Sequence, residues 1–72
     1  MDSIINEYAN YIIKDLISNG MDSKEKLIMA LEMGIETAKR DYADRPQIYK
    51  AYEVALDRVK SHSFERLKEL SK

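Results

Sequence analysis

The side chains that could carry chemistry in this 72-residue chain are a single histidine and a few regularly spaced acids. His62 is the sole imidazole, and the chain has no cysteine. Zinc and catalytic sites need such ligands at set spacings, as in HExxH or Glu-x-x-His, and neither motif is present. We therefore expect His62 to be a half-buried packing residue or a helix-cap partner.

Three glutamates, Glu25, Glu32 and Glu36, repeat at helical spacing. Such a cluster could bind a hard cation or perform acid–base chemistry. Lys39 and Arg40 follow closely, and the acids fall opposite an apolar stripe, which favours a solvated charged face. Two glycines in the whole chain are too few for a glycine-rich phosphate loop. The sequence thus predicts no enzyme activity, no cofactor, no metal and no small-molecule substrate.

The composition is that of a small helical domain spanning residues 1–72. Hydrophobic residues make up 44% of the chain and charged residues 35%, with 12 Lys+Arg against 13 Asp+Glu. This balance gives no general attraction to nucleic acid or anionic lipid. The longest apolar run has five residues, 27–31, whereas a membrane helix needs about 20. The acidic start does not resemble a signal peptide, and the lack of cysteine favours a cytoplasmic location.

Apolar periodicity predicts three helices. The first runs from about Ile4 to Ser18 and is closed by Asn19-Gly20, where Gly20 suits the left-handed position after a helix. The second runs from about Ser23 to Asp41. The third begins near Asp44, since Pro46 fits only in a first turn. Short connections make neighbouring helices antiparallel, so the predicted fold is an all-α, three-helix up-down-up bundle.

Local signals refine the second and third helices. Asp22 with Glu25, and Asp44 with Gln47, have capping-box spacing and predict the two helix starts. Gly34 lies inside the second helix, where glycine costs about 1 kcal/mol relative to alanine. We therefore expect a neighbouring helix to approach closely at Gly34.

The end of the third helix has more than one interpretation. After residues 61–63 the apolar stripe is replaced by Phe64, Leu67 and Leu70, which form a stripe turned by about 60°. We favour a continuous helix with an altered contact. The alternatives are a bend, last turns that leave the bundle for another chain, or a short fourth helix capped by Ser63.

Each helix carries apolar residues that its core stripe does not use. On the first helix the predicted core stripe is Ile5, Tyr8, Ile12 and Leu16. On the second it is Leu27, Leu31, Ile35, Ala38 and Tyr42. The residues outside the core stripes, in chain order, are Ile13, Ile17, Met29, Met33, Val54 and Phe64. Tyr11 and Tyr49 are expected at the edges of the core, where a tyrosine ring is buried and its hydroxyl is wet.

These surplus residues have two explanations. Broad core stripes would account for them without any partner. The alternative is a second interface, because a monomer seldom exposes a large contiguous apolar patch and methionine suits adaptable contacts. On this basis the sequence predicts a small protein-interaction module that acts as a regulator, inhibitor or adaptor by helix-face docking. We expect it to bind another protein or a second copy of itself as a homodimer, through Ile13, Ile17, Met29, Met33, Tyr11, Tyr49, Val54 and Phe64.

The alternative function is that of a DNA-binding transcriptional regulator. Arg45, Gln47 and Lys50 at the start of the third helix could enter a major groove. Asp44 and Glu53 lie close by, and no basic run exceeds two residues. Nucleic acid is therefore the less favoured partner.

Overall fold

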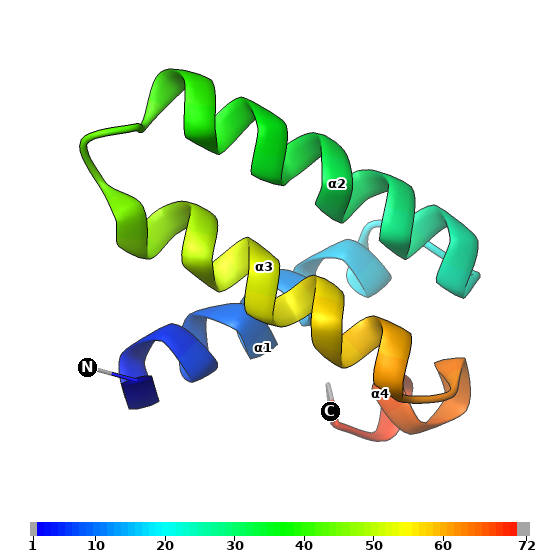
Figure 1. Ribbon diagram of the computed structural model, residues 1–72. Helices are drawn as coiled ribbons and strands as arrows, with labels where there is room; N and C mark the ends of the chain where they lie inside the picture. Colours follow the sequence, from blue (N-terminus) through cyan, green and yellow to red (C-terminus); the bar gives the residue numbers. More distant parts are fainter. Residues whose placement is uncertain (1, 71–72) are drawn as a thin grey trace.

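The computed structural model describes residues 2–70, and within this range it contains four helices and no strand (Figure 1). These are α1 (Asp2–Ser18), α2 (Lys24–Asp41), α3 (Pro46–Ser61) and α4 (Phe64–Leu70). The first three helices alternate in direction, and α4 turns back after the end of α3. This arrangement confirms the predicted all-α up-down-up bundle and adds a short fourth helix.

Helix α3 is the centre of the bundle. It packs along both α2 and α1, whereas α1 and α2 barely contact each other. In Figure 1, α2 lies above α3 and α1 crosses behind it. Because α1 and α2 diverge, the space between them above α3 is lined by side chains rather than closed by helix–helix contact.

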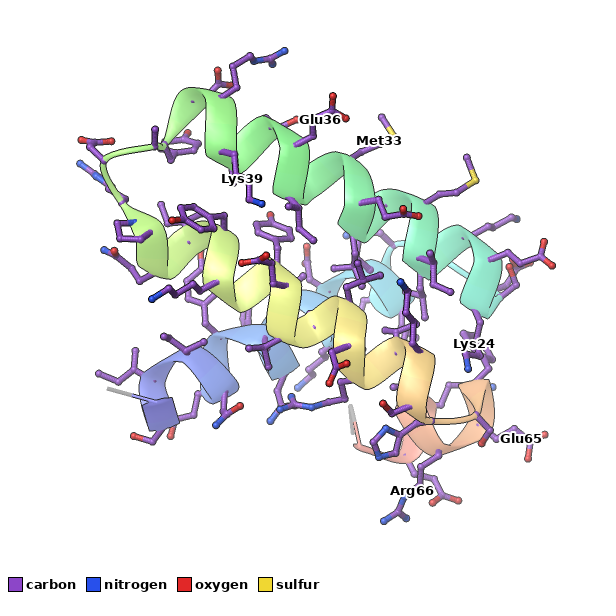
Figure 2. All side chains as sticks on the ribbon, viewed as in Figure 1. Lys24, Met33, Glu36, Lys39, Glu65 and Arg66 are labelled. Carbon is purple, nitrogen blue, oxygen red and sulfur yellow. The ribbon has the colours of Figure 1, made fainter. Side chains whose placement is uncertain are left out.

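The core takes residues from all four helices. Its largest fully buried side chains are Leu27 and Leu31 on α2, Val59 on α3 and Leu67 on α4. The rest of the buried cluster is Ala9, Ile12, Ile13, Ala51 and Ala55. Alanines on both α1 and α3 let these two helices pack closely, while charged side chains such as Glu36 and Glu65 point away from the bundle (Figure 2).

The turn after α1 is a Schellman motif, as the Asn-Gly pair predicted. Gly20 has a φ of +98°, in the left-handed region. Its N–H donates to the carbonyl of Ile17 (3.1 Å), and the N–H of Met21 donates to the carbonyl of Leu16 (3.2 Å). These are the two hydrogen bonds that define this helix ending.

Both capping-box predictions were wrong. Helix α2 is capped by Ser23, whose Oγ accepts from the N–H of Lys26 (3.3 Å), while Asp22 forms an ion pair with Lys26 (2.9 Å). Helix α3 begins at Pro46, as its first-turn preference predicted, but its N-cap is Arg45 with no side-chain capping bond. The proline fixes the start of α3 one residue too late for Asp44 to cap it.

The favoured continuous third helix was also wrong. His62 is extended (φ −124°, ψ 154°) and its Nδ1 donates to the carbonyl of Arg58 (2.9 Å), so it is a half-buried cap residue as expected. Ser63 Oγ then accepts from the N–H of Arg66 (3.2 Å) and caps α4. The break turns the chain so that α4 packs against α1 and Leu67 becomes buried in the core. The side chain of Leu70, the third member of the predicted stripe, lies outside the described residues.

Candidate docking surface

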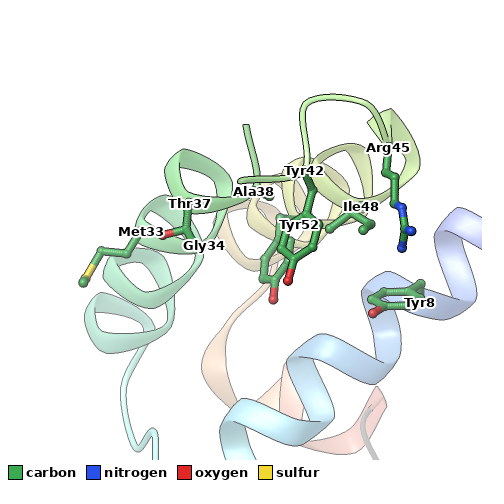
Figure 3. Close-up of a pocket in the computed structure, with 9 residues that line it drawn as sticks. All are labelled: Tyr8, Met33, Gly34, Thr37, Ala38, Tyr42, Arg45, Ile48 and Tyr52. Atoms are coloured by element: carbon green, nitrogen blue, oxygen red, sulfur yellow. The ribbon is translucent and has the colours of Figure 1, made fainter. Parts of the chain in front are cut away.

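A groove runs between α1 and α2, with α3 as its floor. One hollow of about 540 Å³ is lined by Tyr8 from α1, by Met33, Gly34, Thr37 and Ala38 from α2, and by Tyr42, Arg45, Ile48 and Tyr52. Figure 3 shows Tyr42 and Tyr52 projecting into this hollow, with Tyr8 facing them from α1. An adjoining hollow of about 260 Å³ shares Tyr8, Gly34 and Tyr52 and extends along α1 past Tyr11 to Asp15.

On the floor of the groove, the ring of Tyr52 from α3 packs against Gly34 of α2. A Cβ atom at this position would lie 2.7 Å from Cε1 and 2.8 Å from Cδ1 of Tyr52, closer than real carbon atoms pack. The Tyr52 ring therefore packs directly on the α2 backbone at Gly34. This confirms the predicted close approach and explains why α2 carries a glycine in its interior.

Tyr52 is half-buried where it packs on Gly34, and burial raises the pKa of its hydroxyl. Nearby Tyr8, Asp15 and Tyr42 add smaller contributions that also raise the pKa, because negative charge near the ring disfavours the phenolate. The groove thus extends the neutral form of the Tyr52 hydroxyl to pH values above its ordinary pKa of 10.0.

This shift predicts a loss of stability at high pH. A folded-state pKa above the ordinary 10.0 favours the neutral phenol. The stability linked to this neutral phenol is therefore fully present below pH 10.0, and it is lost as the pH rises through the pKa of Tyr52 in the folded protein. We expect the effect to stay below about 1 kcal/mol, because solvent screens a partly exposed ring. Urea unfolding at neutral pH and above the tyrosine range will measure it, with Tyr52→Phe as the reference that removes the hydroxyl. An equal loss in both proteins would contradict the assignment to Tyr52.

Six large apolar side chains are exposed among residues 2–70, and four of them, Tyr8, Tyr11, Met33 and Tyr42, line the groove. On α1, Ile4, Tyr8 and Tyr11 repeat at i, i+4 and i+7, and Tyr11 is 68% exposed. On α2, Met29 and Met33 are one turn apart, and Met33 is 65% exposed. Tyr42, directly after α2, completes the set. Within residues 2–70, none of these six exposed side chains belongs to α3 or α4. We call these six residues the α1–α2 apolar surface.

Comparison with protein-family models, curated proteins and solved structures finds no match to this chain. The α1–α2 apolar surface must therefore be interpreted from its own chemistry. Three of the eight predicted partner-binding residues, Tyr11, Met29 and Met33, are exposed on it. The sequence had correctly placed these two methionines outside the core.

The other predicted docking residues are placed differently. Ile13 is buried in the core at 3% exposure, so its prediction as an exposed residue was wrong. Ile17, Val54 and Phe64 are half-buried and pack against the same core, so broad core stripes explain them. Tyr49 is also half-buried, and the Lys39 Nζ lies 5.6 Å from its ring centroid. It does not line the groove.

The sequence reasoning missed three members of the surface. Ile4 was left unassigned, while Tyr8 and Tyr42 were placed in core stripes, yet Tyr8 is 51% exposed. The core face of α1 is centred on Ala9 and Ile13, which turns Tyr8 out towards the groove. The spacing of Ile4, Tyr8 and Tyr11 was the signal that could have identified them.

The two basic residues at the end of α2 pair with acidic side chains. Lys39 pairs with Glu53 (3.8 Å), and Arg40 pairs with the adjacent Asp41 (3.1 Å). Arg45 lines the groove beside the tyrosines. No structural observation favours DNA binding, which stays an untested prediction.

Two further features bear on the class of site. Among residues 2–70, no group of three or more His, Asp or Glu side chains could hold a metal ion. Over the same range, no helix combines the length and the apolar character that crossing a bilayer requires.

Proposed function

We propose that this protein is an interaction module that binds a helix of a protein partner through the α1–α2 apolar surface. The observation that carries the proposal is that the six large exposed apolar side chains found within residues 2–70 belong to α1, α2 and Tyr42. Exposed apolar surface of this kind favours association, because covering it removes it from water. Tyrosine suits such a surface, since its ring is buried while its hydroxyl finds a polar partner.

The shape of the surface supports a helical partner. The groove lies between helices of 17 and 18 residues and is lined along much of its length by side chains of both. An amphipathic helix that enters such a groove is a recurring mode of recognition. Met29 and Met33 would adapt to the ridges of the incoming helix. We expect the protein to act in the cytoplasm as a regulator, inhibitor or adaptor, by occupying a site on its partner or by self-association.

Site-specific photo-crosslinking tests the proposal. A benzophenone amino acid is placed at position 11 or 33, on the surface, or at position 65, on the exposed outer side of α4 (Figure 2). After irradiation in the cells that make the protein, we expect a discrete cross-linked product from positions 11 and 33 that is absent from position 65. The mass of that product shows whether the partner is another protein or a second copy of the 8.4-kDa chain.

The control at position 65 makes the result specific. Equal cross-linking from all three positions would indicate random contacts, and the absence of any product from positions 11 and 33 would contradict the proposed surface. Far-UV circular dichroism of each purified variant checks that its helices are intact.

A further inference from the structure

We infer that the helix bound by the α1–α2 apolar surface belongs to a different protein and carries two opposite charges beside its apolar stripe. An acidic residue lies opposite Arg45, and a basic residue about two turns away lies opposite Asp15. This inference rests on the proposed function and specifies the chemistry of the partner. It is argued from the charges of the groove and from the pairing of the chain's own basic residues.

Two charged side chains line the groove, one in each hollow. Arg45 is the charged residue among those that line the larger hollow, and Asp15 is the charged residue among those that line the smaller one. Tyr8, Gly34 and Tyr52 line both hollows and so lie between the two charges. The groove therefore has a positive end and a negative end.

Arg45 is available to an acidic group. It is exposed, and it is the N-cap residue of α3 without a side-chain capping bond. Within residues 2–70 its guanidinium forms no ion pair or hydrogen bond. Figure 3 shows Arg45 extending from the start of α3 towards Tyr8, with Tyr42 and Tyr52 in the same hollow. A carboxylate that pairs with Arg45 at this place can also accept hydrogen bonds from tyrosine hydroxyls.

Asp15 belongs to the groove side of α1. It follows Tyr8 by seven residues and Tyr11 by four, so the three side chains share one side of the helix. The Asp15 carboxylate is exposed, forms no ion pair within the described range, and is one of the charges that raise the pKa of Tyr52. Seven residues correspond to about 10 Å along α1. Because Arg45 extends towards Tyr8, this length sets the spacing of about two turns between the acidic and basic residues of the partner helix.

The exposed stripes of the chain itself do not supply this pattern. On α1, the stripe that continues from Tyr8 and Tyr11 to Asp15 includes no basic residue. On α2, Lys26 and Arg40 flank the exposed methionines, and both already form ion pairs with acidic side chains. A second copy would have to give up one of these ion pairs to place a basic residue opposite Asp15. The charges of the groove therefore favour a different protein as the occupant.

Three designed helical peptides test the inference on the purified full chain. Each is an alanine-based peptide of about 18 residues with a single stripe of leucines, flanked by two charged positions about two turns apart. These positions carry Glu and Lys in the first peptide, Glu and Glu in the second, and Lys and Lys in the third. Fluorescence anisotropy of the labelled peptides gives the dissociation constants. At low salt we expect the wild type to bind the Glu–Lys peptide about five-fold more tightly than either of the others, and added salt to reduce this preference.

Charge reversal on the protein is expected to change the preferred peptide. Arg45→Glu makes both ends of the groove negative and should favour the Lys–Lys peptide. Asp15→Lys makes both ends positive and should favour the Glu–Glu peptide. Lys14→Glu is the matched control, because it changes the net charge as much as Arg45→Glu but neither hollow is lined by Lys14. We expect it to keep the wild-type order. Far-UV circular dichroism of the three variants checks that their helices are intact.

The outcomes separate this inference from the proposed function. Equal binding of the three peptides to the wild type, or no binding of any of them, overturns the inference. An order that Arg45→Glu and Asp15→Lys leave unchanged, or that Lys14→Glu alters as much as Arg45→Glu, also overturns it. In each case a discrete cross-linked product from positions 11 and 33 leaves the proposed docking surface standing. A cross-linked product of twice the chain mass makes a second copy the occupant and overturns the inference alone, whereas the absence of any product overturns the proposed function.

Discussion

Replacing Leu67 with alanine is expected to lower the free energy of unfolding by about 2–5 kcal/mol, the usual range for a buried leucine. Leu67 is 1% exposed and is one of the four largest fully buried side chains, although it belongs to a helix of seven residues. A domain of this size has a total stability of about 4–11 kcal/mol. A single side chain near the end of the chain therefore carries a large share of the stability.

Urea unfolding followed by far-UV circular dichroism will measure this effect. Met33→Ala is the matched control, because methionine has a similar volume but is 65% exposed at this position. We expect the control to change the stability by less than about 0.5 kcal/mol. Equal small effects for both variants would show that α4 is not docked on the core.

The importance of Leu67 also explains why the end of α3 was mispredicted. The sequence between α3 and α4 contains no proline or glycine, so no strong local signal ends the helix. The Ser63 cap contributes only about 1 kcal/mol. What decides the break is the burial of Leu67 in the core as α4 packs against α1, which is a tertiary effect. The turned stripe at Phe64 and Leu67 signalled a change of contact but not its geometry.

The first two helices and the start of the third were predictable because apolar periodicity is a local property. The rotation of α1 about its own axis was not, and this is why Tyr8 was placed inside and Ile13 outside. The core face of α1 includes Ala9, which meets a central helix whose own buried residues include Ala51 and Ala55. Alanine contributes little hydrophobic area, so a search for large apolar residues passes over the positions where helices approach most closely.

The groove could not be predicted for a related reason. Its existence depends on α1 and α2 both packing on α3 while scarcely contacting each other. The sequence predicted that helices joined by a short turn are antiparallel, but it did not predict how closely they pack. The sequence identified Met29 and Met33 as surplus and placed Tyr11 at the edge of the core, but the surface that unites them with Tyr8 and Tyr42 arises from the divergence of the two helices.

The second large effect concerns the contact between Gly34 and Tyr52. Gly34→Ala is expected to lower the free energy of unfolding when the Tyr52 ring is present and to raise it when the ring is absent. In the wild type, Gly34→Ala adds a Cβ 2.7 Å from the Tyr52 ring, which must move. Overpacking of this kind costs about 1–3 kcal/mol, and the better helix propensity of alanine returns at most about 1 kcal/mol. We expect a net loss of about 1–2 kcal/mol.

In the Tyr52→Ala background the ring is absent, so the three atoms closest to the added Cβ are removed and the propensity gain is expected to dominate. Gly34→Ala is then expected to stabilise that variant by about 0.5–1 kcal/mol. A double-mutant cycle by urea unfolding measures the coupling between the two positions. Tyr52→Phe is the control that keeps the ring and removes the hydroxyl, and in it Gly34→Ala should remain destabilising. A stabilising Gly34→Ala in the wild type would mean that the ring is not seated on α2. The shape of the groove would then differ, because Tyr52 and Gly34 line both of its hollows.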